Sequence, residues 1–118
     1  MPTAYGKELR KLRIDEDETI QQMAEKLNIS ISYLSSIESG NRKIPNDLTE
    51  KIIEKYSLNK ERSEILWQAE VESSNEIFFD LSKMSLDQRK LAFVLSRELD
   101  DISDEECLKI IGKLKNHE

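Results

Sequence analysis

The chain has 118 residues, of which 37% are hydrophobic and 36% are charged, a size that fits one domain or a small domain with an appended module. It contains no run of about 18 apolar residues and no signal-peptide-like stretch near its start, which argues against a membrane partner and predicts a cytoplasmic protein. The net charge of −6 weighs against nucleic-acid binding, but it is unevenly spread: residues 1–58 hold 9 Lys or Arg against 10 Asp or Glu, and residues 59–118 hold 9 against 14. The acidic excess therefore lies mainly in the second half.

The N-terminal part is predicted to be helical, because strand-like alternation is absent and the whole chain has only three Gly and two Pro. A helix over 5–13 places Leu9 and Leu12 inward, and the acidic run at 15–18 follows it as a loop. The basic residues of this helix are expected to face outward: Lys7, Arg10, Lys11 and Arg13.

Capping signals define the next two helices. Thr19 and Gln22 have the spacing of a capping box, which predicts a helix over 20–27. A turn follows, and Ser30 is placed to cap a second helix over 31–39. The two segments are thus predicted to be short helices joined by a tight turn.

Two further helices are predicted before residue 74. Gly40 stands where a helix commonly ends, and Pro45 and Asn46 introduce a fourth helix. Asn59 begins a fifth helix, which carries the only tryptophan, Trp67. The apolar side of the fourth helix consists of Leu48, Ile52 and Ile53.

The C-terminal part is predicted to hold two more helices. Residues 74–84 form either a short helix or an ordered linker. Ser85 with Gln88, and Ser103 with Glu106, have capping-box spacing and open helices of about 14 and 12 residues. The last helix carries a narrow apolar stripe of Cys107, Ile110, Ile111 and Leu114.

The helix over 31–39 offers an uncharged outer face. Leu34 and Ile37 bury its inner side. Its outer side consists of Ile31, Ser32, Tyr33, Ser35 and Ser36. Such a face can enter a DNA major groove and form hydrogen bonds with base edges. On the loop that follows, cations would meet phosphates, and this loop carries Asn41, Arg42 and Lys43.

The stretch TIQQMAEKLNISISYLSSIESGNRKIP resembles the helix-turn-helix of the lambda-repressor-like (XRE-type) regulators. The resemblance covers roughly residues 5–58 and implies a five-helix DNA-binding domain whose third helix reads the major groove. It places Ser30, Ile31, Ser32 and Ser36 at base-contacting positions and Tyr33 near the groove wall. It places at positions that contact the sugar-phosphate backbone Ser39, Asn41, Arg42 and Lys43.

Two other positions matter for the resemblance. Glu38 matches a structural position that ties the helix end to its surroundings. The family often has Gln at the start of the second helix, where it touches phosphate, and here Ile20 stands there. Gln21 is the neighbouring candidate for this DNA contact, although it lies about 100° further round the helix.

The sequence therefore predicts an all-α protein, with a helix-turn-helix DNA-binding domain over 1–73 and a helical dimerisation region over 74–118. The expected function is sequence-specific binding of double-stranded DNA, as a repressor that binds a near-palindromic operator as a homodimer. Two copies would place two recognition helices about 34 Å apart in successive major grooves.

Two alternatives stay open beside the repressor. One is an antitoxin, or a phage or mobile-element control protein, that also binds a protein partner. The other is a protein-interaction adaptor on the same scaffold. The carboxylate runs at 15–18 and 100–106 have no His beside them and are typical of solvated helix flanks. No enzyme activity, metal site or cofactor is therefore expected.

Overall fold

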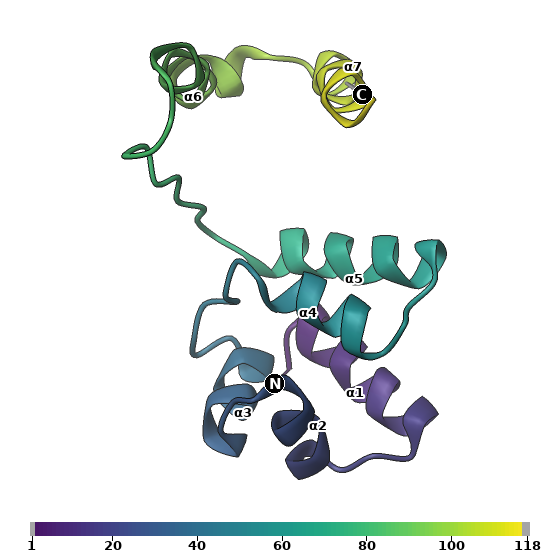
Figure 1. Ribbon diagram of the computed structural model, residues 1–118. Helices are drawn as coiled ribbons and strands as arrows, with labels where there is room; N and C mark the ends of the chain where they lie inside the picture. Colours follow the sequence, from purple (N-terminus) through teal and green to yellow (C-terminus); the bar gives the residue numbers. More distant parts are fainter. Residues whose placement is uncertain (1, 117–118) are drawn as a thin grey trace. The chain divides into compact units, whose positions relative to one another are not determined.

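The computed structural model describes residues 2–116 of the chain. Within this range it holds seven α-helices, one short 3-10 helix and no strand, which confirms the all-α prediction (Figure 1). The chain divides between Ile77 and Phe78 into two compact units. Across the described residues, no helix combines the length and the apolar character that crossing a lipid bilayer demands.

Five helices build the N-terminal unit: α1 (Ala4–Glu16), α2 (Ile20–Leu27), α3 (Ile31–Ser39), α4 (Leu48–Lys55) and α5 (Lys60–Ser73). The C-terminal unit contains α6 (Leu86–Glu98), the 3-10 helix η1 (Leu99–Asp101) and α7 (Asp104–Lys115). The predicted bounds of α2 and α3 agree with the structure, as does the start of α5 after Asn59.

The N-terminal unit is held by one apolar core to which all five helices contribute. In this unit α5 packs along α1, and α3 packs against both α1 and α2 (Figure 1). Burial of a large aliphatic side chain is worth about 1.5–3 kcal/mol, so this core holds the helices in a fixed arrangement. The core consists of Tyr5, Leu9, Leu12, Met23, Ala24, Leu27, Leu34, Ile37, Leu48, Ile52, Leu66 and Ala69.

Caps fix where the helices of this unit begin and end. Thr19 Oγ1 accepts a hydrogen bond from Gln22 N, and Gln22 Oε1 accepts one from Thr19 N, which completes the predicted capping box. Asn28 then adopts a left-handed conformation with φ 59°. Ser30 Oγ caps α3 by accepting from Tyr33 N at 3.1 Å. The predicted tight turn between α2 and α3 is confirmed.

Two details differ from the sequence prediction, and the structure decides between the two alternatives left open for residues 74–84. Helix α1 runs on to Glu16, so the acidic loop is reduced to Asp17 and Glu18; Asp17 ends the helix in a left-handed conformation with φ 56°. Residues 74–84 form no helix, which leaves the linker alternative. Ser103 caps α7 by accepting from Glu106 N at 3.1 Å, but only this half of the expected capping box is formed.

The C-terminal unit has no core of its own. None of the described residues 78–116 is buried, and Leu86, Leu91 and Phe93 of α6 are each at least half exposed. Ser85 and Gln88 form the capping box that opens α6, as predicted. This unit is therefore a pair of capped helices with apolar side chains at their surface.

Candidate nucleic-acid interface

One side of α3 is exposed and carries small hydroxyl groups. Successive residues are about 100° apart around a helix, so Ser32, Ser35, Ser36 and Ser39 fall on one side. The structure leaves Ser32, Ser35 and Ser39 exposed and Ser36 half-buried, whereas the opposite side is closed by buried Leu34, Ile37 and Glu38. This side of α3, together with Ile31 and Tyr33 at its edges, is called the serine face below.

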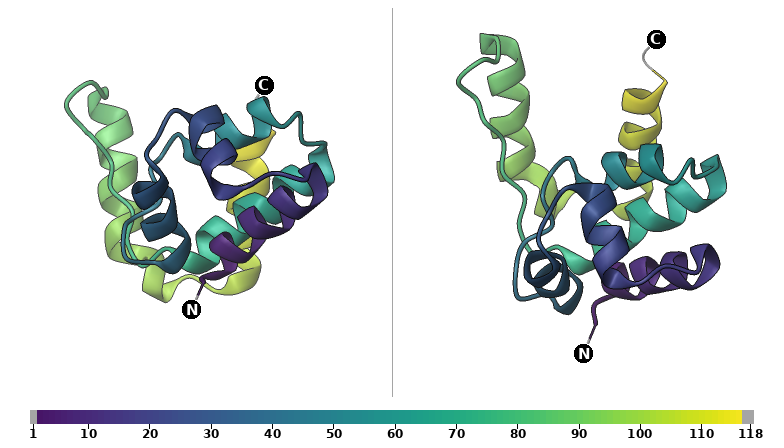
Figure 2. Two further views of the ribbon diagram at one scale, coloured as in Figure 1. Left: turned by 90° about the horizontal axis from the view of Figure 1, so that it is seen from below. Right: turned by 60° about the horizontal axis from the view of Figure 1, so that its bottom comes forward.

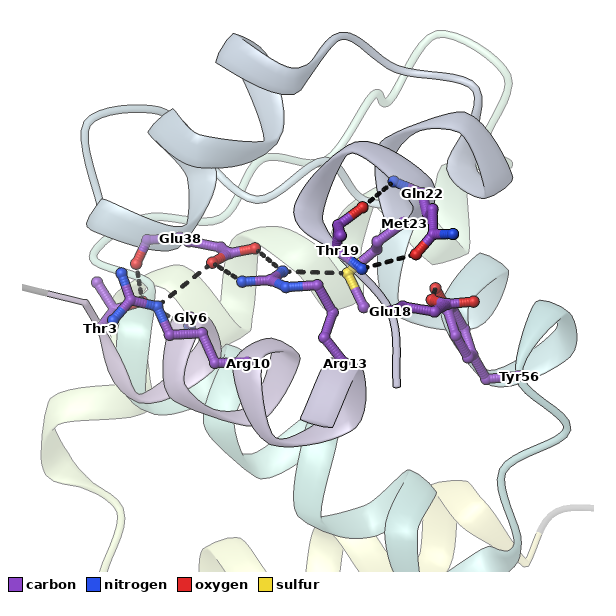
Figure 3. A network of polar contacts seen from close by, with 10 residues as sticks. All are labelled: Thr3, Gly6, Arg10, Arg13, Glu18, Thr19, Gln22, Met23, Glu38 and Tyr56. Atoms are coloured by element: carbon purple, nitrogen blue, oxygen red, sulfur yellow. Dashed lines mark hydrogen bonds and ion pairs between the residues drawn. The ribbon is translucent and has the colours of Figure 1, made fainter. Parts of the chain in front are cut away.

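The C-terminal end of α3 is fixed to α1 by a buried ion pair. Glu38 is 3% exposed, and its carboxylate accepts two hydrogen bonds from the Arg13 guanidinium, one of them at 3.0 Å (Figure 3). Arg10 Nε lies 3.7 Å from the same carboxylate, and Arg13 Nη1 lies 3.3 Å from the Met23 sulfur of α2. Three helices therefore meet at the side chains of Arg13 and Glu38.

The backbone of Glu38 is held as well as its side chain. Its carbonyl oxygen accepts from Thr3 N at 3.0 Å and from Thr3 Oγ1 at 3.2 Å, while the same hydroxyl oxygen accepts from Gly6 N and caps α1. A Cβ atom added at Gly6 would lie 2.2 Å from the Glu38 carbonyl oxygen. Glycine is therefore required for this close approach, in which the start of α1 meets the end of α3 (Figure 2).

The loop after α3 is tied to the last turn of that helix. Gly40 takes the left-handed conformation, with φ 86°, that a helix end requires. The Ser36 carbonyl oxygen accepts from Asn41 N at 2.9 Å and from Arg42 N at 3.2 Å, and Ser39 Oγ donates to it at 3.2 Å. The backbone that carries the loop cations is thus positioned relative to the serine face.

The exposed cations of the loop have neighbours of their own. The Arg42 guanidinium lies 5.7 Å from the ring centroid of half-buried Tyr33, a cation–π arrangement that joins the loop to α3. Lys43 Nζ lies 3.6 Å from Glu76 Oε2, and both side chains are more than half exposed. A phosphate that approached Lys43 would compete with Glu76.

The remaining predicted contacts lie at the starts of α3 and α2. Ser30 is exposed, and its hydroxyl is also 3.4 Å from that of Ser32. Ile31 is 44% exposed. Gln21, on α2, is exposed, whereas Ile20 beside it is half-buried and packs against the core. Gln21 is the one member of the predicted set that belongs to α2, and the others are brought together on α3 and its loop.

A second polar contact fixes the α1–α2 loop. Glu18 accepts hydrogen bonds of 2.6 Å from both Lys26 Nζ and Tyr56 Oη, and Lys26 Nζ lies 4.3 Å from the Tyr56 ring centroid. Burial acts to raise the pKa of Glu18, but the bonds from Lys26 and Tyr56 outweigh it and hold that pKa below its usual value. Burial and the Glu18 carboxylate raise the pKa of Tyr56.

Sequence reasoning missed one feature of this region. Arg13 was expected to face outward, but its side chain is only 11% exposed, because it pairs with a carboxylate that the chain brings in from α3. The prediction for Arg13 was wrong. Ser35 was predicted to lie on the outer side of this helix, and the structure confirms that it is exposed on the serine face.

Comparison with known families agrees with this geometry. A family model described as a helix-turn-helix domain matches residues 4–64, just over half of the chain. The chain belongs to the helix-turn-helix domain family. Neither the comparison with curated proteins nor that with solved structures gave a match.

The helix-turn-helix domain includes both partners of every contact of α3 and its loop except those made by Thr3 and Glu76. It runs from the start of α1 into the first turns of α5, and it contains the serine face, the loop and the Arg13–Glu38 pair. Its family supports DNA as the partner of this domain.

Among residues 2–116, no group of three or more His, Cys, Asp and Glu side chains is arranged to hold a metal ion.

Proposed function

We propose that the protein is a sequence-specific regulator of the lambda-repressor-like (XRE) type, which binds double-stranded DNA and represses transcription. The observation that carries the proposal is the serine face, a largely exposed and uncharged side of a helix whose end is bonded to α1 by the Arg13–Glu38 pair. Hydroxyl groups can donate to or accept from the base edges that a major groove presents. The proposed role is to bind DNA without catalysing a reaction. The proposed location is the cytoplasm.

The contacts are proposed to divide between bases and phosphates. Ser32 and Ser36 lie on the serine face and are assigned to base edges, with Ser30 and Ile31 at its N-terminal end. The loop cations Arg42 and Lys43 are assigned to phosphates. Exposed Lys and Arg side chains supply the sequence-independent share of DNA affinity. Other phosphate contacts are assigned to Ser39, Asn41 and Gln21.

A homodimer is part of the proposal. One copy offers few cations beside the serine face, so a single domain should bind DNA weakly. Two linked copies would bind two half-sites, and the second binding event would gain from a high effective concentration. A near-palindromic operator with half-sites about 34 Å apart follows from two-fold symmetry.

The experiment is a gel-shift titration of the full chain against the DNA upstream of its own gene, with a scrambled duplex of equal length and composition as control. The proposal expects binding to the upstream DNA at least about 1,000-fold tighter than to the scrambled duplex. Equal affinity for the two duplexes would refute sequence-specific regulation. Genome-wide mapping of the tagged protein would then identify the operator and the regulated genes.

A second candidate is a control protein, such as an antitoxin, that also binds a protein partner. The observation that favours it is the linker, where Ile77 is 70% exposed and Phe79 is 59% exposed. Exposed apolar side chains in a row are typical of protein interaction sites. The double variant Ile77→Ser/Phe79→Ser should abolish binding of the protein encoded by the neighbouring gene and leave DNA binding intact. Unchanged binding of that protein would dismiss this candidate.

The third alternative, an adaptor without DNA binding, would bind no duplex in the gel-shift test.

A further inference from the structure

The C-terminal unit lacks the means to hold its helices by itself. No residue among the described positions 78–116 is buried, and α6 and α7 have only 13 and 12 residues. Isolated helices shorter than about 12–15 residues are marginal in water, and most helical stability in proteins comes from packing of an apolar side. These helices therefore need another surface to pack on.

The apolar stripe of α7 is such a packing surface. Its four residues, Cys107, Ile110, Ile111 and Leu114, follow one another at spacings of one to three and recur on one side of the helix. Ile111 is 42% exposed and Leu114 is 52% exposed, while Cys107 and Ile110 are half-buried. The stripe runs along most of a helix about 18 Å long.

The charges of α7 are divided between its two ends. The first turn carries three acidic residues, and the basic residues of the last turn are Lys113 and Lys115. Glu106 and Lys113 are seven residues apart, about 20° short of two full turns, so they flank the stripe on the same side. Two parallel copies of α7 would place like charges together. Two antiparallel copies would place Glu106 of each beside Lys113 of the other.

We infer that the stripe of α7 is the contact between two copies of this chain, with the two α7 helices antiparallel and related by a two-fold axis. This inference rests on the homodimer of the proposed function and names its interface and its orientation. Apolar side chains supply the attraction, and the charged flanks select the antiparallel arrangement. Two 12-residue helices offer much less than the roughly 1,600 Å² of a standard interface, so the dimer is expected to form in the micromolar range.

The test measures dimer dissociation of the full chain by sedimentation equilibrium at about 50 mM salt, where charge pairs are weakly screened. Glu106→Lys and Lys113→Glu should each weaken the dimer about tenfold, because each change creates two like-charge contacts per dimer. The two changes alter the net charge in opposite directions, so a general charge effect cannot weaken both. The double variant Glu106→Lys/Lys113→Glu should restore dissociation to within about threefold of the original chain.

Glu105→Lys is the matched control. It makes the same charge change in the same helix turn, but about 100° away from Glu106, where Glu105 lies 3.7 Å from Lys109 of its own helix. It should weaken the dimer less than threefold, since it affects only the helix dipole and that exposed pair.

Two outcomes would overturn the inference. If Glu106→Lys has no more effect than Glu105→Lys, or if the double variant does not recover, the antiparallel α7 contact is wrong although the dimer of the proposed function can stand. If the chain stays a monomer up to about 100 μM, above the micromolar range expected for so small a contact, the stripe is not a contact between copies and the proposed homodimer fails with it. The gel-shift test of the proposed function is independent of both results. A chain that still prefers the upstream DNA keeps its proposed DNA binding even if the α7 contact is wrong.

Discussion

The carboxylate of Glu38 at the end of α3 pairs with the guanidinium of Arg13 on α1, although 25 residues separate them in the chain. The two side chains are 4% and 11% exposed, so the pair is nearly removed from water. Buried charges are tolerated only when they are paired. This pair therefore fixes the C-terminal end of α3, next to the serine face, to α1.

Removal of one partner of this pair is predicted to be strongly destabilising. Arg13→Met leaves the buried Glu38 without its main cation and should lower the free energy of unfolding by about 3–5 kcal/mol in urea titrations. The double variant Arg13→Met/Glu38→Met should be more stable than Arg13→Met alone, because no buried charge remains unpaired. The control Arg62→Met removes an exposed pair with Asp15 and should cost at most about 1 kcal/mol. A loss of similar size in Arg13→Met and Arg62→Met would contradict this account of the pair.

The close approach of α1 and α3 gives a second prediction. Gly6→Ala would place a Cβ atom 2.2 Å from the Glu38 carbonyl oxygen, a backbone atom that cannot rotate away. The expected loss in free energy of unfolding is about 1–3 kcal/mol. In contrast, a Cβ at Gly112 would meet nothing within 4 Å, so Gly112→Ala should raise the helix content measured by circular dichroism. Equal stability of Gly6→Ala and the original chain would show that the helices are not held at this distance.

Stability is predicted to fall in acid through Glu18. Hydrogen bonds from Lys26 and Tyr56 lower the pKa of Glu18 in the folded state, against the effect of burial. Its contribution to stability is therefore fully present above the ordinary carboxyl pKa of about 4.3, and is lost as the pH falls through the lowered value. The difference in free energy of unfolding between the original chain and Glu18→Gln should be largest near neutral pH and shrink in acid. A difference that stays constant between about pH 7 and pH 3 would exclude this linkage.

The bounds of α2 and α3 could be predicted from the sequence because they depend on local chemistry. Thr19, Gln22, Ser30 and Gly40 act on backbone groups within a few residues, and the structure confirms the role expected of each. The serine face also followed from local spacing, since buried Leu34 and Ile37 mark the opposite side of α3.

The pairing of Arg13 with Glu38 could not be predicted in the same way. It depends on the crossing of α1 and α3, which the core residues of several helices determine together. The contact of Glu18 with Tyr56 likewise joins residues 38 positions apart. The resemblance to a known family indicated a structural role for Glu38 but did not identify its partner. Long-range polar pairs of this kind become visible only when the helices are packed.

The salt dependence of operator binding is predicted to be shallow for a repressor. Lys43 is beside Glu76, and Arg10 is beside Glu38, so few cations of α1 and the loop are available to phosphates. The slope of log affinity against log salt concentration should be about −4 to −6 for a dimer. Fluorescence anisotropy between about 50 and 200 mM salt measures it. A slope near −10 would mean that cations such as Arg10 or Lys11 reach the DNA backbone.

The central claim is that the serine face reads bases while the loop touches phosphates. The most direct test compares operator and random-DNA affinities of Ser32→Ala and Ser36→Ala with those of Arg42→Ala and Lys43→Ala. The loop is held by the Ser36 carbonyl oxygen, which Ser36→Ala keeps, and equal helix content by circular dichroism would confirm that all four variants are folded.

The serine variants are predicted to lose about 1–3 kcal/mol at most on the operator and almost nothing on random DNA. The loop variants should weaken both kinds of DNA alike and reduce the salt slope by about one unit per copy. Serine variants that keep full operator preference while Tyr33→Ala loses it would contradict the claim and assign the readout to Tyr33. If none of the variants changes binding to any DNA, the serine face is not a DNA-reading surface.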